Sequence, residues 1–127
     1  MPGEFANQPV EVFRQLMEIN YFGAVYATHA LLPAMQSRGS GYIVNISSMA
    51  GFLGAYGYSA YGASKYALRG FSDVLRAELK PMGIQVSVVF PPDTDTPQLA
   101  AEMPHKPAIT KELSKSASIM TPQAVAA

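Results

Sequence analysis

The stretch "YIVNISSMAGFLGAYGYSAYGASKYALRGFSDVLRAELKPMGIQVSVVF", residues 42–90, decides the fold. Its two ends, "YIVNIS" (42–47) and "IQVSVVF" (84–90), are short, β-branched and nearly continuous in apolar character. Such runs are typical of parallel strands that are covered on both faces. Between them, residues 58–80 repeat apolar side chains at helical spacing and end at "KPMG" (80–83), which predicts a right-handed strand–helix–strand crossover. The expected apolar stripe of this helix is Ala60, Ala63, Ala67, Phe71, Val74 and Leu75.

Upstream, helical spacing over residues 9–36 predicts a second helix, with Pro33 kinking or ending its final turn and "SRGSG" (37–41) stopping it. Downstream, residues 91–127 hold six of the ten prolines and predict an irregular lobe with a short helix near 110–117. A doubly wound parallel sheet needs more than two strands. We therefore expect the C-terminal part of a larger α/β domain, with further strands upstream.

Composition excludes several kinds of site. The 127 residues are 49% apolar and 14% charged, which indicates a globular domain, and nine basic residues balance nine acidic ones. Neither sign forms a run, so we expect no nucleic-acid partner. Cysteine is absent and only two histidines occur, His29 and His105, which we interpret as structural or solvated; we expect no metal site. No apolar run approaches 18 residues, so we expect no transmembrane segment in this chain.

Tyr61 and Lys65 lie four residues apart, which places them on one helix face beside the carboxyl end of the strand at 42–47. An ammonium about 5 Å from a phenol favours the phenolate by roughly 3 kcal/mol, or about 2 pKa units. We therefore expect the pKa of Tyr61 to be lowered, making it an acid and base. Ser48 offers a hydroxyl that can hold a carbonyl oxygen. Chance alone supplies about 0.3 such Tyr–Lys pairs in this composition, so a solvated surface pair is the alternative.

The joint pattern is more specific than the pair. "NYFG" (20–23), "NISSMAG" (45–51) and "YGASK" (61–65) together resemble the short-chain dehydrogenase/reductase family over nearly the whole chain. The resemblance implies a partial Rossmann domain whose glycine-rich phosphate loop is not in this sequence. It further implies that Ser48, Tyr61 and Lys65 are catalytic and that Asn20 is a structural and proton-relay residue.

The same resemblance implies a nicotinamide cofactor. Tyr61 and Lys65 would contact it, and "PPDTDT" (91–96) stands where the family approaches the nicotinamide, which makes Pro91, Thr94 and Thr96 candidate contacts. Pro92 replaces the glycine that the family usually has. "VVFPPDTDTP" (88–97), "KP" (106–107) and "TPQAVA" (121–126) resemble the 3-ketodihydrosphingosine reductase group. This implies NADP(H) rather than NAD(H), and reduction of a long-chain lipid ketone to a secondary alcohol.

Alternatives remain open. Instead of a lipid ketone reductase, the chain could be a non-catalytic fragment or helix-pairing module. It could also be a family member that acts on another carbonyl or hydroxyl substrate. We expect a homo-oligomer through the helices at 9–36 and 58–80, and a cytoplasmic protein that associates with membranes only through segments not present here. Residues 91–127 are expected to form a substrate-side lobe.

Three further groups of residues are interpreted from their local sequence. Asp93 and Asp95 are interpreted as turn residues that bond their own backbone. Asn45 either braces the active-site loop or is accommodated by packing. Another set either lines a substrate groove or packs: Met49, Phe52, Leu53, Tyr56 and Tyr58.

Overall fold

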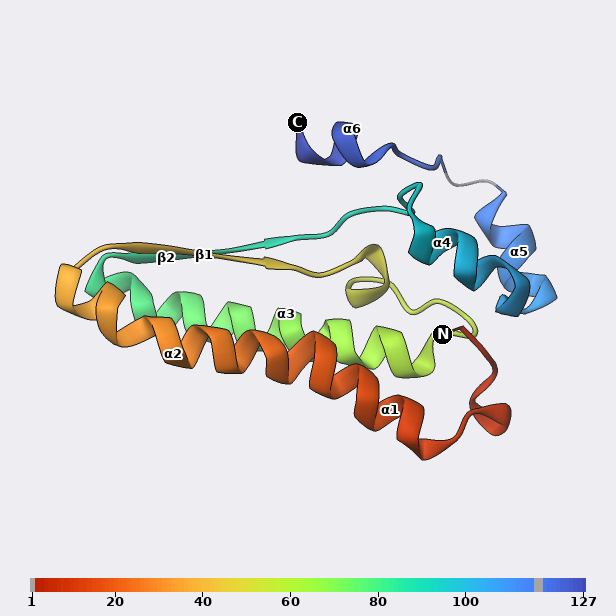
Figure 1. Ribbon diagram of the computed structural model, residues 1–127, viewed down its shortest axis with the longest axis horizontal. Helices are drawn as coiled ribbons and strands as arrows, with labels where there is room; N and C mark the ends of the chain where they lie inside the picture. The colour runs from red at the N-terminus through yellow and green to blue at the C-terminus, as the bar shows by residue number, and fades with distance from the viewer. Residues whose placement is uncertain (1, 116–117) are drawn as a thin grey trace.

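The computed structural model describes residues 2–115 and 118–127 (Figure 1). Two long helical runs lie along a two-stranded sheet, and a lobe of short helices follows the second strand. The α-helices are α1 (Val10–Met17), α2 (Gly23–Arg38), α3 (Ser59–Leu79), α4 (Pro97–Glu102), α5 (Ala108–Ser114) and α6 (Pro122–Ala126). The strands are β1 (Gly41–Ile46) and β2 (Ile84–Val89), and a π-helical turn, η2, spans Glu18–Phe22. The 3₁₀ turns are η1 (Phe5–Asn7), η3 (Met49–Gly51), η4 (Lys80–Met82) and η5 (Met103–His105).

The two strands pair in parallel, as predicted, in a register that runs from Gly41 opposite Ile84 to Ile46 opposite Val89. Parallel neighbours need a long connection, and α3 supplies it. The carboxyl ends of both strands therefore meet at one end of the sheet, where the loop 47–58 and the turn 91–96 leave it.

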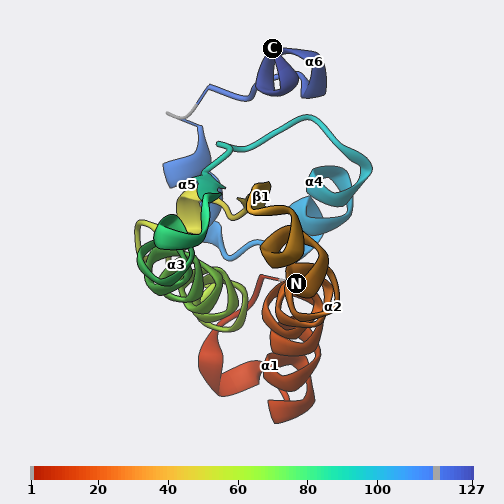
Figure 2. The same cartoon turned by 90° about the vertical axis from the view of Figure 1, so that its left-hand side faces the viewer.

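Both long helices cover the same face of the sheet (Figure 2). The core on that face is Leu75 and Leu79 of α3 against Ile84 and Val86 of β2. On the other face β1 exposes Tyr42, Val44 and Ile46, with 73%, 56% and 54% of their surfaces accessible. No helix of the described residues packs on this second face, so the expected coverage of β1 on both faces stays a prediction for the larger domain.

The N-terminal helix is continuous from Val10 to Arg38. Pro33 lies inside α2 and the helix continues to Arg38, so a helix end at Pro33 is wrong, and the alternative of a kink there stays a prediction. Proline lacks an N–H and therefore removes one helical hydrogen bond without stopping the remaining ones. Gly39 ends the helix in the left-handed conformation, with φ at 66°.

The buried face of α3 contains serines that the expected apolar stripe leaves out. Ser64 and Ser72 are fully buried, whereas Val74, placed on the stripe, is 59% exposed. Asn45 donates from Nδ2 to Ser72 Oγ at 2.8 Å, and that hydroxyl donates to the Leu68 carbonyl at 2.7 Å. Asn45 thus ties β1 to α3, which is neither of the two roles left open for it.

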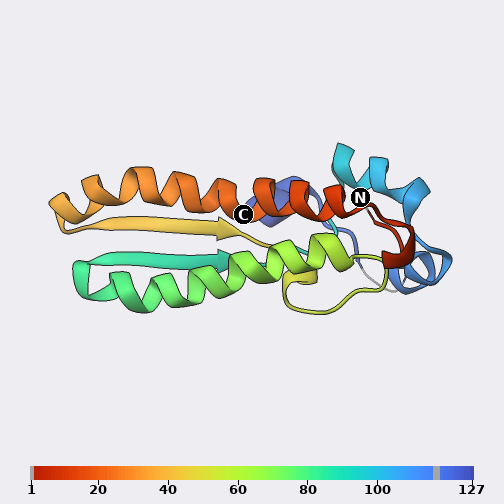
Figure 3. The same cartoon turned by 90° about the horizontal axis from the view of Figure 1, so that it is seen from below.

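The lobe follows β2 and lies beyond the carboxyl ends of the strands (Figure 3). Its predicted helix near 110–117 appears as α5 from Ala108 to Ser114, and residues 116–117 of that prediction lie outside the described residues. Two helices, α4 and α6, were not predicted. Each has threonine at its N-cap and proline in its first turn, Thr96 with Pro97 and Thr121 with Pro122. Over the described residues, no helix is long and apolar enough to cross a membrane.

Candidate active site

A cavity of about 810 Å³ opens where the strands end, between the loop 47–58, the start of α3 and the lobe. This volume lies within the range of about 300–1,000 Å³ that is usual for small-molecule sites. Its lining includes six of the seven residues that the sequence singles out for catalysis or cofactor contact: Ser48, Tyr61, Lys65, Pro91, Thr94 and Thr96.

Tyr61 and Lys65 share one face of α3, near its start. Lys65 Nζ lies 5.7 Å from the centre of the Tyr61 ring and donates to the Ile46 carbonyl, at the end of β1, at 3.0 Å. The strand therefore fixes the ammonium beside the phenol.

The pKa values of this pair differ from the expectation. Burial raises the pKa of Tyr61, a hydrogen bond with Ser48 lowers it, and the charges of Glu102 and Asp93 raise it. Burial lowers the pKa of Lys65. The predicted lowering of the Tyr61 pKa by Lys65 is therefore wrong for this chain by itself. Burial therefore shifts the two pKa values in opposite directions, raising that of Tyr61 and lowering that of Lys65.

Adjacent serines after β1 have opposite surroundings. Ser47 also lines the cavity, but it is only 4% exposed and its hydroxyl donates to the Lys65 carbonyl at 3.1 Å. Ser48 caps η3 by accepting from the Ala50 N–H at 3.2 Å, and its side chain bonds Tyr61. Of the two serines, Ser48 is therefore the one whose hydroxyl bonds the phenol of Tyr61.

We expect Ser48→Ala to lower turnover of an active ketone by about 100-fold, because one anchor of the reacting oxygen is lost. Ser47→Ala should leave turnover within about threefold and cost at most about 1 kcal/mol of stability, the usual contribution of one hydrogen bond. Steady-state kinetics and thermal unfolding of both variants check this. Equal losses of turnover in the two variants would contradict the assignment of Ser48.

Asn20 lies in the π-helical turn η2 and does not line the main cavity. Its Nδ2 donates to Ser64 Oγ at 3.0 Å, and Ser64 Oγ donates to the Tyr61 carbonyl at 2.7 Å. A smaller cavity of about 330 Å³ is lined by Asn20 together with Tyr61 and Lys65. The structure thus links Asn20 to the backbone of α3, and its part in proton relay stays a prediction.

The turn 91–96 is held by a hydrogen bond within itself and by hydrogen bonds to neighbouring segments. Thr94 Oγ1 donates to the Pro92 carbonyl at 2.9 Å, and the Pro91 carbonyl accepts from the Met49 N–H at 3.1 Å. Thr96 Oγ1 caps α4 by accepting from the Leu99 N–H. Proline at position 92, where the family usually has glycine, is accommodated in this turn, and contacts of Pro91, Thr94 and Thr96 with a cofactor stay a prediction.

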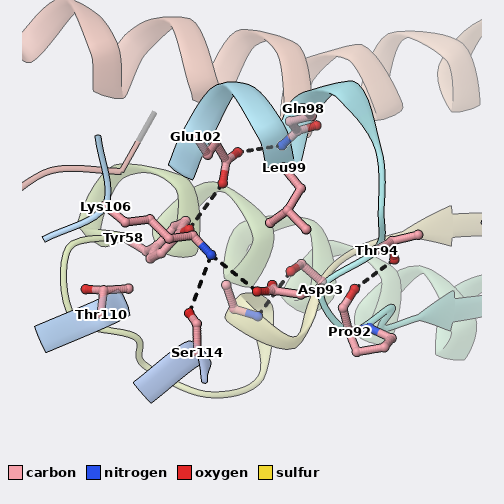
Figure 4. Close-up of polar contacts among 12 residues, drawn as sticks. Tyr58, Pro92, Asp93, Thr94, Gln98, Leu99, Glu102, Lys106, Thr110 and Ser114 are labelled. Carbon is pink, nitrogen blue, oxygen red and sulfur yellow. Dashed lines mark hydrogen bonds and ion pairs between the residues drawn. The ribbon is translucent and has the colours of Figure 1, made fainter. Parts of the chain in front are cut away.

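Lys106 and Glu102, two charged residues of the cavity wall, were missed by the sequence reasoning (Figure 4). Lys106 is only 3% exposed, and its Nζ lies 3.3 Å from Asp93 Oδ2 and 3.5 Å from Ser114 Oγ. Asp93 therefore forms an ion pair, and its interpretation as a turn residue bonding its own backbone is wrong. Tyr58 Oη donates to Glu102 Oε2 at 3.1 Å, and burial, followed by the charge of Glu102, raises the pKa of Tyr58.

The five residues that could line a groove or pack fall into two groups. Four of them line the cavity: Met49, Leu53, Tyr56 and Tyr58. Phe52 instead stacks edge-on against Phe90 at 5.9 Å, with Arg69 over its ring at 4.9 Å. Within the described ranges, no group of three or more His, Asp or Glu side chains is placed to hold a metal ion.

Sequence comparison relates the chain to known enzymes. A family model described as short chain dehydrogenase matches residues 1–107. The chain is 44% identical over 126 residues to the 3-dehydrosphinganine reductase of Danio rerio and to the 3-ketodihydrosphingosine reductase of Bos taurus. It is 45% identical over 128 residues to the 3-ketodihydrosphingosine reductase of Dictyostelium discoideum. Each alignment covers 99% of this chain and 38% of the relative, so the chain spans well under half of their length.

Solved structures agree on the fold. A 3-oxoacyl-[acyl-carrier protein] reductase from Brucella melitensis superposes with a TM-score of 0.81 at 31% identity, over 97% of this chain and 46% of that one. A putative NAD(P) dependent gluconate 5-dehydrogenase from Beutenbergia cavernae, with bound NADP, gives a TM-score of 0.83 at 26% identity, over 98% and 53% of the two chains. The chain therefore has the architecture of part of a Rossmann domain.

Proposed function

The chain belongs to the short-chain dehydrogenase family, and we propose that it is the catalytic half of an NADP(H)-dependent ketone reductase. The observation that carries the proposal is the convergence of Ser48, Tyr61 and Lys65 on one cavity at the carboxyl ends of parallel strands. Open α/β sheets bind their ligands at this edge. The complete enzyme denotes this chain together with the strands and glycine-rich loop that we propose precede it.

The residues present fit the nicotinamide end of such a cofactor. The Tyr61 hydroxyl and the Lys65 ammonium lie at the cavity wall, where they can bond the hydroxyls of a ribose. The turn at Pro91, Thr94 and Thr96 lines the same cavity and would hold the nicotinamide edge. When bound, the reduced cofactor supplies a hydride to the carbonyl carbon.

Side chains of this chain then bind and protonate the carbonyl oxygen of the substrate. Ser48 donates a hydrogen bond to the carbonyl oxygen and holds it beside the phenol. Tyr61 gives its hydroxyl proton to that oxygen as the negative charge develops, so ketone, hydride and proton yield a secondary alcohol. The Lys65 ammonium would stabilise the phenolate that remains until water restores the proton.

The proposed substrate is a long-chain lipid ketone of the 3-ketodihydrosphingosine type. The names of the relatives from Danio rerio, Bos taurus and Dictyostelium discoideum support it, since those proteins are reductases of this ketone. The cavity wall also offers apolar surface from Met49, Leu53 and Leu99 beside its polar groups. Such a mixed wall suits a polar head that carries a hydrocarbon chain.

Two further parts of the proposal concern partners and location. A homo-oligomer would use the faces of α2 and α3, which expose Tyr26, Leu31, Tyr66 and Val74. We keep the cytoplasmic location as part of the proposal, with membrane contact left to other segments.

The test is cofactor oxidation by the complete enzyme. Purified protein should oxidise NADPH when 3-ketodihydrosphingosine is added, faster than it oxidises NADH, and faster than with acetone as a short ketone. Absence of NADPH oxidation with long and short ketones alike, in a protein that binds NADPH, would reject the reductase and favour a non-catalytic helix-pairing module.

A further inference from the structure

One carboxylate in the cavity has no cationic partner among the described residues. The charged side chains on the wall are Lys65, Asp93, Glu102 and Lys106. Asp93 is paired with Lys106, and Lys65 is directed to the Ile46 carbonyl and the Tyr61 ring. In the part of the chain that the structure describes, Glu102 forms no ion pair. Glu102 is therefore the carboxylate of this wall that has no direct ion pair among the described residues, although the four wall charges sum to zero.

Neutral donors hold this carboxylate in place. Tyr58 Oη donates to Oε2 at 3.1 Å, and Gln98 Nε2 donates to Oε1 at 2.8 Å (Figure 4). Each carboxylate oxygen accepts more than one hydrogen bond, so both keep free acceptor capacity. A fixed carboxylate with spare acceptors binds an ammonium group at little cost in side-chain entropy.

The carboxylate is close to the reacting centre. The Tyr58 ring, which bonds Glu102 through its hydroxyl, lies 6.0 Å from the Tyr61 ring, centre to centre. Glu102 and Tyr61 line both cavities together, and the charge of Glu102 raises the Tyr61 pKa. A cation beside Glu102 would offset that charge.

We propose that Glu102 is a specificity-determining residue that selects ketones carrying an ammonium group on the carbon next to the carbonyl. The inference rests on the proposed function, because the carbonyl oxygen must sit between Tyr61 and Ser48 for a neighbouring ammonium to reach Glu102. The Lys106–Asp93 pair supports it, because Asp93 already has a cationic partner and Glu102 has none among the described residues. The substrate class is thus a long-chain α-amino ketone.

The test compares two ketones in the complete enzyme and its Glu102→Gln variant. The first ketone is 3-ketodihydrosphingosine, and the second is the same molecule with hydrogen in place of its amino group. Glutamine keeps the size of the side chain and removes the charge. We expect kcat/KM for the amino ketone to fall about 10- to 100-fold, the effect of losing one charge-assisted hydrogen bond. For the amine-free ketone we expect a change of less than about threefold, because that substrate makes no such bond.

Glu112→Gln is the matched control, since Glu112 on α5 is exposed and pairs with Lys115 outside the cavity. Glu102→Asp, which keeps the charge, should keep part of the preference for the amino ketone. Binding of dodecylamine and dodecanol to the NADP⁺ complex, followed by calorimetry, gives a second readout: Glu102→Gln should weaken only the amine.

The outcomes separate the two proposals. Equal losses for both ketones, or a Glu102→Gln variant whose only defect is weaker NADPH binding, would overturn the role of Glu102 and leave the reductase standing. A wild-type enzyme that reduces neither ketone would overturn the reductase and, with it, this inference. If Glu102→Gln does not fold, the wild-type NADP⁺ complex still decides, because it should bind dodecylamine more tightly than dodecanol, and equal affinities would refute the role of Glu102.

Discussion

Tyr61→Phe in the complete enzyme should fold, bind NADPH with unchanged affinity to within a few-fold, and turn over about 100-fold or more slowly than the wild type, since loss of a general acid typically costs about 10²–10⁴ in rate. The substitution keeps the ring, its edge-on contact with Tyr58 at 6.0 Å and the cation contact with Lys65 at 5.7 Å. It removes only the hydroxyl that gives the proton. The measurement is single-turnover ketone reduction with saturating NADPH.

Tyr66→Phe provides the matched control for this experiment. Tyr66 lies on the same helix, is 43% exposed, and donates from its hydroxyl to the Phe52 carbonyl at 2.6 Å, away from Ser48. Its loss should cost little turnover. Near-normal turnover of Tyr61→Phe would mean that Tyr61 and Lys65 form an ordinary pair on a helix face, and the reductase would then lack its proton donor.

The parallel pair of strands was predictable because its signal is local. "YIVNIS" and "IQVSVVF" are apolar nearly throughout, and the connection between them is long enough for a crossover. The buried face of α3 was less predictable. Ser64 and Ser72 are serines, a polar residue type that is usually exposed. Their burial depends on hydrogen-bond partners that lie far away in the sequence, Asn20 and Asn45. Hydrogen bonds of this kind satisfy buried hydroxyls, and hydrophobic periodicity does not report them.

The site was predictable only as far as short motifs reach. Ser48, Tyr61 and Lys65 belong to patterns with fixed spacing, and the structure brings them to one cavity. Glu102 belongs to no such pattern, and "KP" (106–107) gave Lys106 no role in the site, because both roles arise only when the lobe folds back over the strand ends and puts Lys106 beside Asp93. The expected pKa of Tyr61 was wrong for a related reason. Coulomb's law at one distance omitted the burial of both groups, which has the larger effect here.

Lys65→Met in the complete enzyme should reduce turnover by about 100-fold or more and also weaken NADPH binding by about tenfold, because one ammonium serves both the phenol and the ribose. Methionine keeps much of the length of the side chain, so the loss reports the ammonium. Without it, Tyr61 remains near the negative charges of Glu102 and Asp93 with no cation beside it. Lys80→Met is the control, because Lys80 directly follows α3 and is exposed. Fluorescence of bound NADPH measures affinity separately from turnover.

The pH profile of the Lys65→Met variant should shift in a defined direction. Ketone reduction needs the protonated phenol, so activity falls as pH rises through the Tyr61 pKa. If Lys65 acts as a cation beside the phenol in the complete enzyme, as proposed, its removal disfavours the phenolate and raises that pKa, so the basic limb should move to higher pH in Lys65→Met. Lys65→Arg keeps a charge and should shift the limb less. In alcohol oxidation, where the phenolate accepts the proton, the same change should move the acidic limb upward. A Lys65→Met variant with both limbs unmoved and only weaker NADPH binding would restrict Lys65 to holding the cofactor.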